Sequence, residues 1–350
     1  MRPTRRIEFL DHVRGVAILG VMLFHAVEAS FGPTIWHEGP VWLRPTSLGS
    51  LGVAMFFVVS GFCIHTSHVG SGETGFSRFF LRRFFRIYPP YLFALALFAV
   101  GRDFSMPQLA SHAGLFHNFD SRWFQAINPS FWSIAVEWQL YCVYPLFHVA
   151  ALRFGWSPVL AVLAVIEVSL VLLDRIYALP TALRHSVFGY GCSWSVGAAL
   201  AAAWLRGSPL PFRHTSHRIL WPVLTVVPVC IAPSLAVFSF LFGALSTASW
   251  ISWALSRESS PTSGPQLAIL PLVGACSYSI YLLHQPLLRA LSLPQFPPLL
   301  NLAWLLLTCV PVMLIGYAAY RFVELPSIAL GKAIARILLA RRAFRAAPAP

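Results

Sequence analysis

Residues 9–26, FLDHVRGVAILGVMLFHA, form an apolar run that carries four charged or titratable side chains. Such groups are costly to bury in a membrane span, so their presence there indicates a functional site. Arg14 and His25 are eleven residues apart, which on a helix places them within about 20° of one face and about 16 Å apart along the axis. One face would then hold a permanent cation near one membrane surface and a proton-transfer group about three turns deeper. The alternative is that Arg14 only reaches lipid head groups and that His25 is a packing residue.

The composition of the chain indicates a polytopic membrane protein. Of the 350 residues, 57% are hydrophobic and only 11% are charged, against about 25% charged residues in an ordinary soluble domain, and the mean hydropathy is +0.69. Apolar spans of about 20 residues predict an all-α fold of about ten transmembrane helices in one bundle. The expected spans are residues 13–31, 47–66, 87–101, 131–152, 157–174, 184–205, 219–235, 236–257, 267–291 and 299–322.

The positive charge predicts the orientation of the chain. The net charge of +13 comes almost wholly from arginines, and these lie in short loops and tails between the apolar spans. The positive-inside rule explains this placement better than nucleic-acid binding does, so we expect no nucleic-acid partner. With the N-terminus in the cytoplasm, the inner segments hold 18 basic residues and the outer loops hold 6. We therefore predict a multi-pass protein of the cell inner (plasma) membrane with both termini cytoplasmic.

An arginine-rich inner loop precedes the third span, with the sequence SRFFLRRFFRIYPP at residues 77–90. Arg83 and Arg86 lie three residues apart and therefore share a face of a helix. Arginine is the preferred side chain for bidentate binding of phosphate. Because phenylalanines are interleaved with the arginines, we predict an amphipathic helix at the membrane interface. An anchor that binds anionic membrane lipids is the alternative.

The fourth span carries a carboxylate, Glu137, in the segment FWSIAVEWQLY at residues 131–141. A carboxylate inside a membrane needs a partner. His25 and Glu137 each lie about six residues from the outer end of their span, hence about 9 Å below the outer surface. This matched depth predicts a His25–Glu137 pair in which the carboxylate orients an imidazole that acts as general base. A purely structural hydrogen bond between two helices is the alternative.

Further polar side chains are expected to contact substrate. In SYSIYLLHQP, residues 277–286, Tyr281 and His284 can lie on one face of the ninth span, a pattern typical of a helix that faces a cavity. Ser60 lies beside a glycine in the middle of the second span, where small residues permit close approach of helices. Trp132 flanks the carboxylate of the fourth span. We assign Ser60, Trp132, Tyr281 and His284 to substrate binding.

The sequence predicts neither a metal centre nor a disulfide framework. The six cysteines lie inside apolar spans without metal-type spacing, and His112 and His117 lack a third ligand. We divide the chain into a transmembrane domain, residues 1–330, and a basic cytoplasmic tail, residues 331–350. Residues 258–266 have the composition of a polar linker. The first apolar run contains a histidine and is long enough to span, so we predict a retained helix and not a cleaved signal peptide.

In their order along the chain, these segments resemble the acyltransferase-3 family of integral membrane acyltransferases. The resemblance rests on LDHVRGVAILGVMLFH (10–25), FFVVSGF (56–62), LRRFFRIYPPY (81–91), FWSIAVEWQLY (131–141) and SYSIYLLHQP (277–286). It covers nearly the whole chain and implies a fold of about ten helices. It also implies that His25 is the catalytic histidine and that Arg14, Arg83 and Arg86 serve the donor.

The resemblance implies transfer of an acyl group, usually acetyl from acetyl-CoA, to a hydroxyl of a carbohydrate such as an exopolysaccharide, an O-antigen or a lipid-linked sugar. Acyl-CoA would be a cytoplasmic substrate, and we expect no permanently bound cofactor. The pantetheine arm of CoA is comparable in length to the rise of about 16 Å from Arg14 to His25, so the thioester could reach His25 from the inside. We predict that His25 deprotonates the acceptor hydroxyl, which attacks the thioester directly, with a covalent acyl-histidine as the rival step.

A proton-coupled transporter or exporter of a glycan or lipid-linked sugar is the alternative class. Such a protein would also carry histidine, glutamate and arginine inside its spans. It would be expected to have broken helices or two matching halves. Prolines interrupt residues 228–233, but the sequence contains no internal repeat, so we favour the enzyme.

Overall fold

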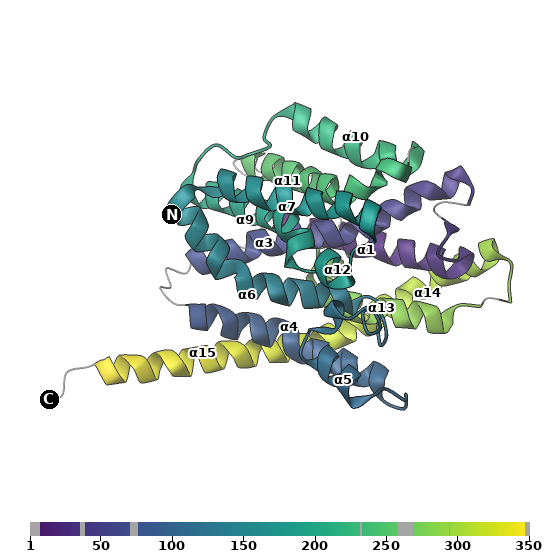
Figure 1. The fold of residues 1–350 in the computed structure, drawn as a ribbon. Helices are drawn as coiled ribbons and strands as arrows, with labels where there is room; N and C mark the ends of the chain where they lie inside the picture. The colour runs from purple at the N-terminus through teal and green to yellow at the C-terminus, as the bar shows by residue number, and fades with distance from the viewer. Residues whose placement is uncertain are drawn as a thin grey trace.

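The computed structural model describes residues 8–35, 39–70, 76–231, 233–257, 269–293 and 295–346, and the regular structure in these ranges is entirely helical. The long helices run roughly parallel or antiparallel to one another and form a single bundle (Figure 1). The prediction of an all-α fold is confirmed.

The helices follow the predicted spans closely. The first part of the chain forms α1 (Glu8–Phe31), the 3-10 helix η1 (Val41–Leu51), α3 (Gly52–Gly70), α4 (Phe76–Ala99), α5 (Met106–Ala113), the 3-10 helix η2 (His117–Phe119), α6 (Phe131–Phe154) and α7 (Trp156–Tyr177). The second part forms α8 (Thr181–Arg184), α9 (Val187–Arg206), α10 (Thr215–Ile231), the 3-10 helix η3 (Pro233–Phe238), α11 (Ser239–Arg257), α12 (Ile269–Ala275), α13 (Ser277–Leu291), α14 (Pro298–Ala319), the π-helix η4 (Tyr320–Glu324) and α15 (Leu325–Ala346).

Several of these helices can cross a bilayer. Five described segments are both long and apolar enough: Glu8–Phe31, Val41–Val69, Trp156–Tyr177, Ala236–Arg257 and Pro298–Leu338. The helices α4, α6 and α9, with 24, 24 and 20 residues, also have the required length but are less uniformly apolar. The chain is a polytopic membrane protein, as its composition predicts.

The arginine-rich segment is helical, as predicted, and it runs into the third predicted span without a break. It forms the first half of α4, which continues without interruption through Pro89 and Pro90. Pro89 cannot donate a hydrogen bond to the carbonyl of Phe85 four residues earlier, which normally breaks a helix. Here the hydroxyl of Ser327, on α15, donates to that carbonyl instead. A neighbouring helix thus satisfies the group that the proline frees, and α4 continues.

Two other predicted spans differ in detail. The ninth span is divided at Cys276 into α12 and α13. The region 219–257, which prolines make ambiguous in the sequence, forms α10, η3 and α11. The predicted linker, residues 258–266, lies outside the described residues.

Helices α3 and α9 meet backbone to backbone. A Cβ atom added to Gly61 would lie 2.1 Å from the carbonyl oxygen of Trp194, and one added to Gly197 would lie 1.9 Å from the carbonyl oxygen of Val58. Only glycine fits at such contacts, which confirms the close approach predicted in the middle of the second span. The indole Nε1 of Trp194 donates to Ser60 Oγ over 3.3 Å and so fixes the position of this hydroxyl.

The last helices form one long rod. The π-helix η4 joins α14 to α15, and α15 lies beside α4 and projects beyond the rest of the bundle (Figure 1). We call the end from which α15 projects the arginine-rich end, because Arg82, Arg83 and Lys332 lie there, and the other end the opposite end. The predicted boundary at residue 330 falls inside α15.

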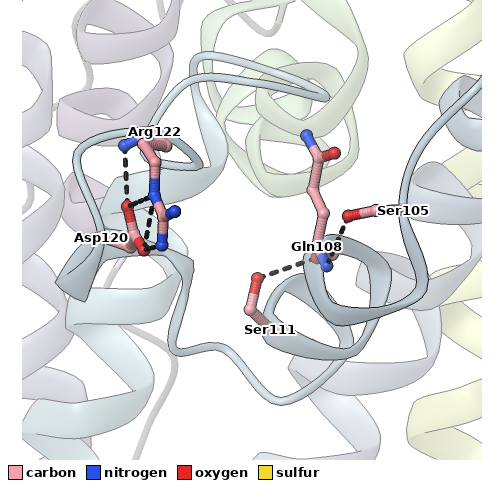
Figure 2. A network of polar contacts seen from close by, with 5 residues as sticks. All are labelled: Ser105, Gln108, Ser111, Asp120 and Arg122. Carbon is pink, nitrogen blue, oxygen red and sulfur yellow. Dashed lines mark hydrogen bonds and ion pairs between the residues drawn. The ribbon is translucent and has the colours of Figure 1, made fainter.

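The segment between α4 and α6 is held by short polar contacts (Figure 2). Ser105 caps α5 by accepting a hydrogen bond from the backbone N–H of Gln108, and Ser111 Oγ donates to the carbonyl of Gln108 over 2.8 Å. Farther along, the guanidinium of Arg122 donates to both carboxylate oxygens of Asp120 and holds the pKa of Asp120 below its ordinary value. These contacts give the longest predicted outer loop a defined conformation.

Candidate active site

A cavity of about 750 Å³, which we call the large cavity, lies between α1, α3, α4, α6, α13 and α15. Its lining includes five cationic side chains, Arg14, Arg82, Arg83, Arg86 and Lys332. It also includes three acidic side chains, Asp11, Glu137 and Glu324. The excess of positive charge suits an anionic ligand, and the volume falls within the range of about 300–1,000 Å³ typical of small-molecule sites.

Arg14 is fixed at the wall of the large cavity by two contacts. Its Nη1 donates to Asp11 Oδ1 over 2.8 Å, one turn earlier on α1, and its Nη2 lies 3.1 Å from Cys63 Sγ on α3. The side chain is largely buried, with 19% of its surface exposed. The guanidinium therefore faces the cavity.

Arg83 and Arg86 face the same cavity from α4, as their spacing predicts. Within the described ranges neither guanidinium forms an ion pair, and Arg83 Nε is buried without a hydrogen-bond partner. A buried cation without a partner is strongly unfavourable. Two guanidiniums that share one helix face and form no ion pair among the described residues are suited to bind a phosphate or pyrophosphate group.

Glu137 lies in the large cavity with two hydroxyl groups. Ser60 Oγ donates to Glu137 Oε1 over 2.6 Å, and the Tyr141 hydroxyl donates to the same oxygen over 2.5 Å. The two hydroxyls are themselves 3.1 Å apart. Nearby, Ser133 Oγ and the Tyr281 hydroxyl are 2.8 Å apart and also line the cavity. A carboxylate and four hydroxyls thus meet deep in the cavity.

His25 lies at a second, smaller cavity of about 140 Å³, which we call the small cavity. Its Nδ1 is 2.9 Å from Glu28 Oε2, one turn later on α1. The remaining lining comes from Ala29, Pro33, Gln285 and Arg289. Because a carboxylate only accepts, Nδ1 carries a proton, and in the neutral imidazole Nε2 then presents the lone pair that a general base requires.

The predicted His25–Glu137 pair is therefore wrong. The structure gives His25 the partner Glu28, gives Glu137 the partners Ser60 and Tyr141, and places the two groups at different cavities. Equal depth in the membrane was the basis of the prediction. Depth does not fix lateral position, and α1 packs mainly against η1, α3, α12, α13 and α14, whereas α6 packs mainly against α7 and α9.

His284 stands between the two cavities. It is fully buried, and its ring lies 5.2 Å from that of His25 at the small cavity and 5.2 Å from that of Tyr281 at the large cavity. Its Nδ1 is 2.7 Å from the carbonyl oxygen of Tyr281, so Nδ1 carries the proton. Its Nε2 is buried and has no hydrogen-bond partner within the described part of the chain. The lone pair of His284 Nε2 therefore lies between the two cavities.

The end of the loop before α6 braces this part of α13. Asn128 Nδ2 donates to the carbonyl of Leu282 over 2.9 Å, and Ser130 Oγ donates to Gln285 Oε1 over 2.6 Å. Gln285 in turn lines the small cavity. The loop therefore supports the side of the cavity that faces α13.

Comparison with known proteins identifies the family. The model of a family described as an acyltransferase domain matches residues 7–321, which is nearly the whole chain. The chain belongs to the acyltransferase-3 family. The resemblance inferred from the motifs is confirmed, and the membership favours the enzyme over the transporter alternative.

Two relatives of this acyltransferase are similar to it over most of its length. It is 26% identical to the peptidoglycan O-acetyltransferase OatA of Listeria monocytogenes over 91% of the chain, and 24% identical to the O-acetyltransferase OatA of Staphylococcus aureus over 93% of the chain. The chain spans 55% and 58% of the length of these two relatives. No solved structure matches it.

Trp132 lies away from both cavities of the acyltransferase. Its ring packs against those of His185 and Tyr190, at 5.1 Å and 5.4 Å, and against Phe124 at 6.1 Å. The reason is helical geometry: Trp132 is five residues before Glu137, which turns it by about 140° to another face of α6. The structure therefore does not bring Trp132 together with the other predicted site residues.

Glu324 is a cavity residue that our sequence analysis did not assign to the site. Residues 320–324 are π-helical, and Arg321, three residues before Glu324, is exposed. Glu324 instead turns into the large cavity, where Ser279 Oγ donates to its Oε2 over 2.7 Å. Its Oε1 is buried without a hydrogen-bond partner among the described residues.

Glu28 and Lys332 were also missed. A carboxylate three residues after a histidine on one helix is a signal that could have identified Glu28. Lys332 gives no such signal, because only the packing of α15 against α4 brings it to the large cavity.

Proposed function

We propose that this acyltransferase moves an acetyl group from acetyl-CoA to a hydroxyl of a carbohydrate acceptor. The observation that carries the proposal is the pairing of two cavities along α1. A cationic cavity contains Arg14, and a small cavity contains the His25–Glu28 pair eleven residues later. Such an arrangement lets a polyanionic donor and a neutral acceptor approach one reaction centre from opposite ends.

The large cavity supports CoA as the donor. CoA carries a pyrophosphate and a further phosphate, so its negative charge complements the five cations of the lining. With Arg83 and Arg86 on the pyrophosphate, the pantetheine arm would extend past Arg14 toward Tyr281 and His284. The rise of about 16 Å between Arg14 and His25 is comparable in length to that arm. The positive-inside rule supports a cytoplasmic position for the arginine-rich end, and hence for both termini.

His25 would act as the general base. Its Nε2 takes the proton of the acceptor hydroxyl while the hydroxyl oxygen attacks the carbonyl carbon of the thioester. The tetrahedral intermediate then loses the CoA thiolate as the carbon–sulfur bond breaks, and the imidazolium returns its proton to that sulfur. Glu28 stabilises the imidazolium through the 2.9 Å contact to Nδ1. Tyr281 and His284 lie where the thioester and the hydroxyl would meet.

Glu137 would act in the large cavity and not on His25. It holds the hydroxyls of Ser60 and Tyr141 at fixed positions, 2.6 Å and 2.5 Å from one of its oxygens. We therefore assign Glu137 a positioning role toward the acyl donor, with Ser60 and Tyr281 as donor contacts.

The acceptor is inferred from the relatives. One relative carries the name of a peptidoglycan O-acetyltransferase and the other that of an O-acetyltransferase. The first name supports a surface carbohydrate as the acceptor class. We propose an acceptor of this kind, such as peptidoglycan, an exopolysaccharide, an O-antigen or a lipid-linked sugar.

The direct test uses the purified protein in nanodiscs with acetyl-CoA and soluble peptidoglycan fragments. Release of the CoA thiol, together with acetyl esters on the fragments detected by mass spectrometry, is the expected result. Thiol release without ester formation would support acetyl-CoA as the donor and would show that peptidoglycan is not the acceptor. Absence of thiol release with any short acyl-CoA would overturn the proposal.

Replacing Arg83 with glutamine is expected to raise the KM for acetyl-CoA about tenfold and to leave kcat nearly unchanged, since about 1.4 kcal/mol of binding free energy corresponds to a factor of ten. Steady-state kinetics of thiol release measures both constants. Arg153, an exposed arginine in the last turn of α6 that does not line the large cavity, provides the control Arg153→Gln. If the KM for acetyl-CoA were the same in both variants, Arg83 would not bind the donor, and the alternative of a lipid anchor would hold.

A further inference from the structure

The first turns of α15 are fixed against α4 by two contacts around Phe85. Ser327 donates to the Phe85 carbonyl that Pro89 leaves free. One turn later, a Cβ atom added to Gly331 would lie 2.6 Å from Phe85 Cβ, so the two helices touch at this glycine. The next residue, Lys332, is therefore held at a defined position beside α4 and is not carried on a loose tail.

Lys332 lines the large cavity from this position. It lies eight residues after Glu324, hence about 12 Å farther along the axis of α15. Glu324 is within electrostatic range of Arg86 and Arg14. Lys332 is exposed, and in the described residues it makes no ion pair. The cavity thus has a further cationic position on α15, beside the α4 arginines that we assign to the pyrophosphate.

We propose that Lys332 binds the 3′-phosphate of CoA and makes this acyltransferase selective for CoA thioesters over shorter thioester donors. The inference rests on the proposed function and adds to it a specificity determinant at the mouth of the donor site. Lysine presents a compact point charge suited to a phosphate monoester, whereas the planar guanidiniums of Arg83 and Arg86 suit a bridging pyrophosphate. The two kinds of cation match the two kinds of phosphate in the donor.

The test compares acetyl-CoA with acetyl-3′-dephospho-CoA in nanodiscs that contain only phosphatidylcholine. For the wild-type protein, kcat/KM is expected to be about tenfold higher with acetyl-CoA, a ratio typical of one charged contact. In Lys332→Gln the ratio should fall to about one, through a higher KM for acetyl-CoA and an unchanged KM for the dephospho donor. The matched control is Arg336→Gln, because Arg336 is exposed one turn later on the same helix and does not line the cavity.

An unchanged ratio in Lys332→Gln, or an equal loss with both donors, would overturn the inference while leaving the proposed function intact. Consumption of neither donor by the wild-type protein would overturn the proposed function, and the inference with it. Gly331→Val offers a second variant that keeps the lysine charge but moves α15 away from Phe85, and it should also lower the ratio.

The phosphate that Lys332 binds could also belong to a lipid head group. The same measurements in nanodiscs that contain phosphatidylglycerol separate the two sources. A lipid contact predicts that anionic lipid changes the activity of the wild-type protein and not that of Lys332→Gln, equally with both donors. The CoA contact predicts that the donor ratio is the same in both lipid compositions.

Discussion

Replacing His25 with glutamine is expected to lower kcat for acetyl transfer by a factor of about 10²–10⁴, the usual contribution of a general base. Glutamine keeps hydrogen-bonding capacity at the small cavity but cannot accept a proton at neutral pH. The KM for acetyl-CoA should change little, because His25 lines the small cavity and the cationic residues that we assign to the donor line the large one. Steady-state thiol release and the binding constant of acetyl-CoA measure the two effects.

His12→Gln is the matched control for this substitution. His12 lies on the same helix, its Nδ1 is 3.0 Å from the carbonyl oxygen of Glu8, and it lines neither cavity. It should retain wild-type kcat. Full activity in His25→Gln would remove the general base from the mechanism. If acetyl groups accumulate on the wild-type protein without acceptor, and not on His25→Gln, the mechanism would proceed through a covalent acyl-histidine and not through direct attack.

The sequence predicted the elements of the fold well because membrane spans impose strong constraints on composition. A run of about 20 apolar residues has few alternatives to a transmembrane helix, so the expected spans agree with α1, α6, α7, α9 and α14 to within a few residues. Prolines limited the prediction elsewhere. Taken locally, Pro89 and Pro90 predict that a helix ends before them. The helix continues because the hydroxyl of Ser327, more than 200 residues later, donates to the carbonyl that Pro89 leaves free.

The candidate site was predictable where it depends on one helix and not where it depends on two. The predictions for Arg83 and Arg86, and for Ser60, each depended on residues of a single helix. The structure places all three side chains at the large cavity. The pairing of His25 with Glu137 required the lateral arrangement of α1 and α6. The rise of about 1.5 Å per residue gives depth along each axis but not which axes are neighbours.

Replacing Glu28, the hydrogen-bond partner of His25, with glutamine is expected to lower kcat about 100-fold. This corresponds to a loss of about 2.7 kcal/mol of transition-state stabilisation. The amide removes the negative charge 2.9 Å from Nδ1, so the imidazolium that forms during attack loses its counter-charge. The KM for acetyl-CoA should stay constant. Glu28→Asp keeps a carboxylate on the same face and should recover part of the rate, which a purely structural role would not predict.

Glu137→Gln distinguishes the two arrangements of the site. If Glu137 supported His25, as matched depth suggested, its amide variant would show the same fall in kcat as Glu28→Gln. In the observed arrangement, Glu137 accepts from Ser60 and Tyr141 in the large cavity, so its loss should disturb the donor side and raise the KM for acetyl-CoA. A large fall in kcat for Glu137→Gln, with Glu28→Gln unaffected, would contradict the assignment of Glu28. The opposite pattern is expected, because among the residues that the structure describes only Glu28 makes a hydrogen bond with the imidazole.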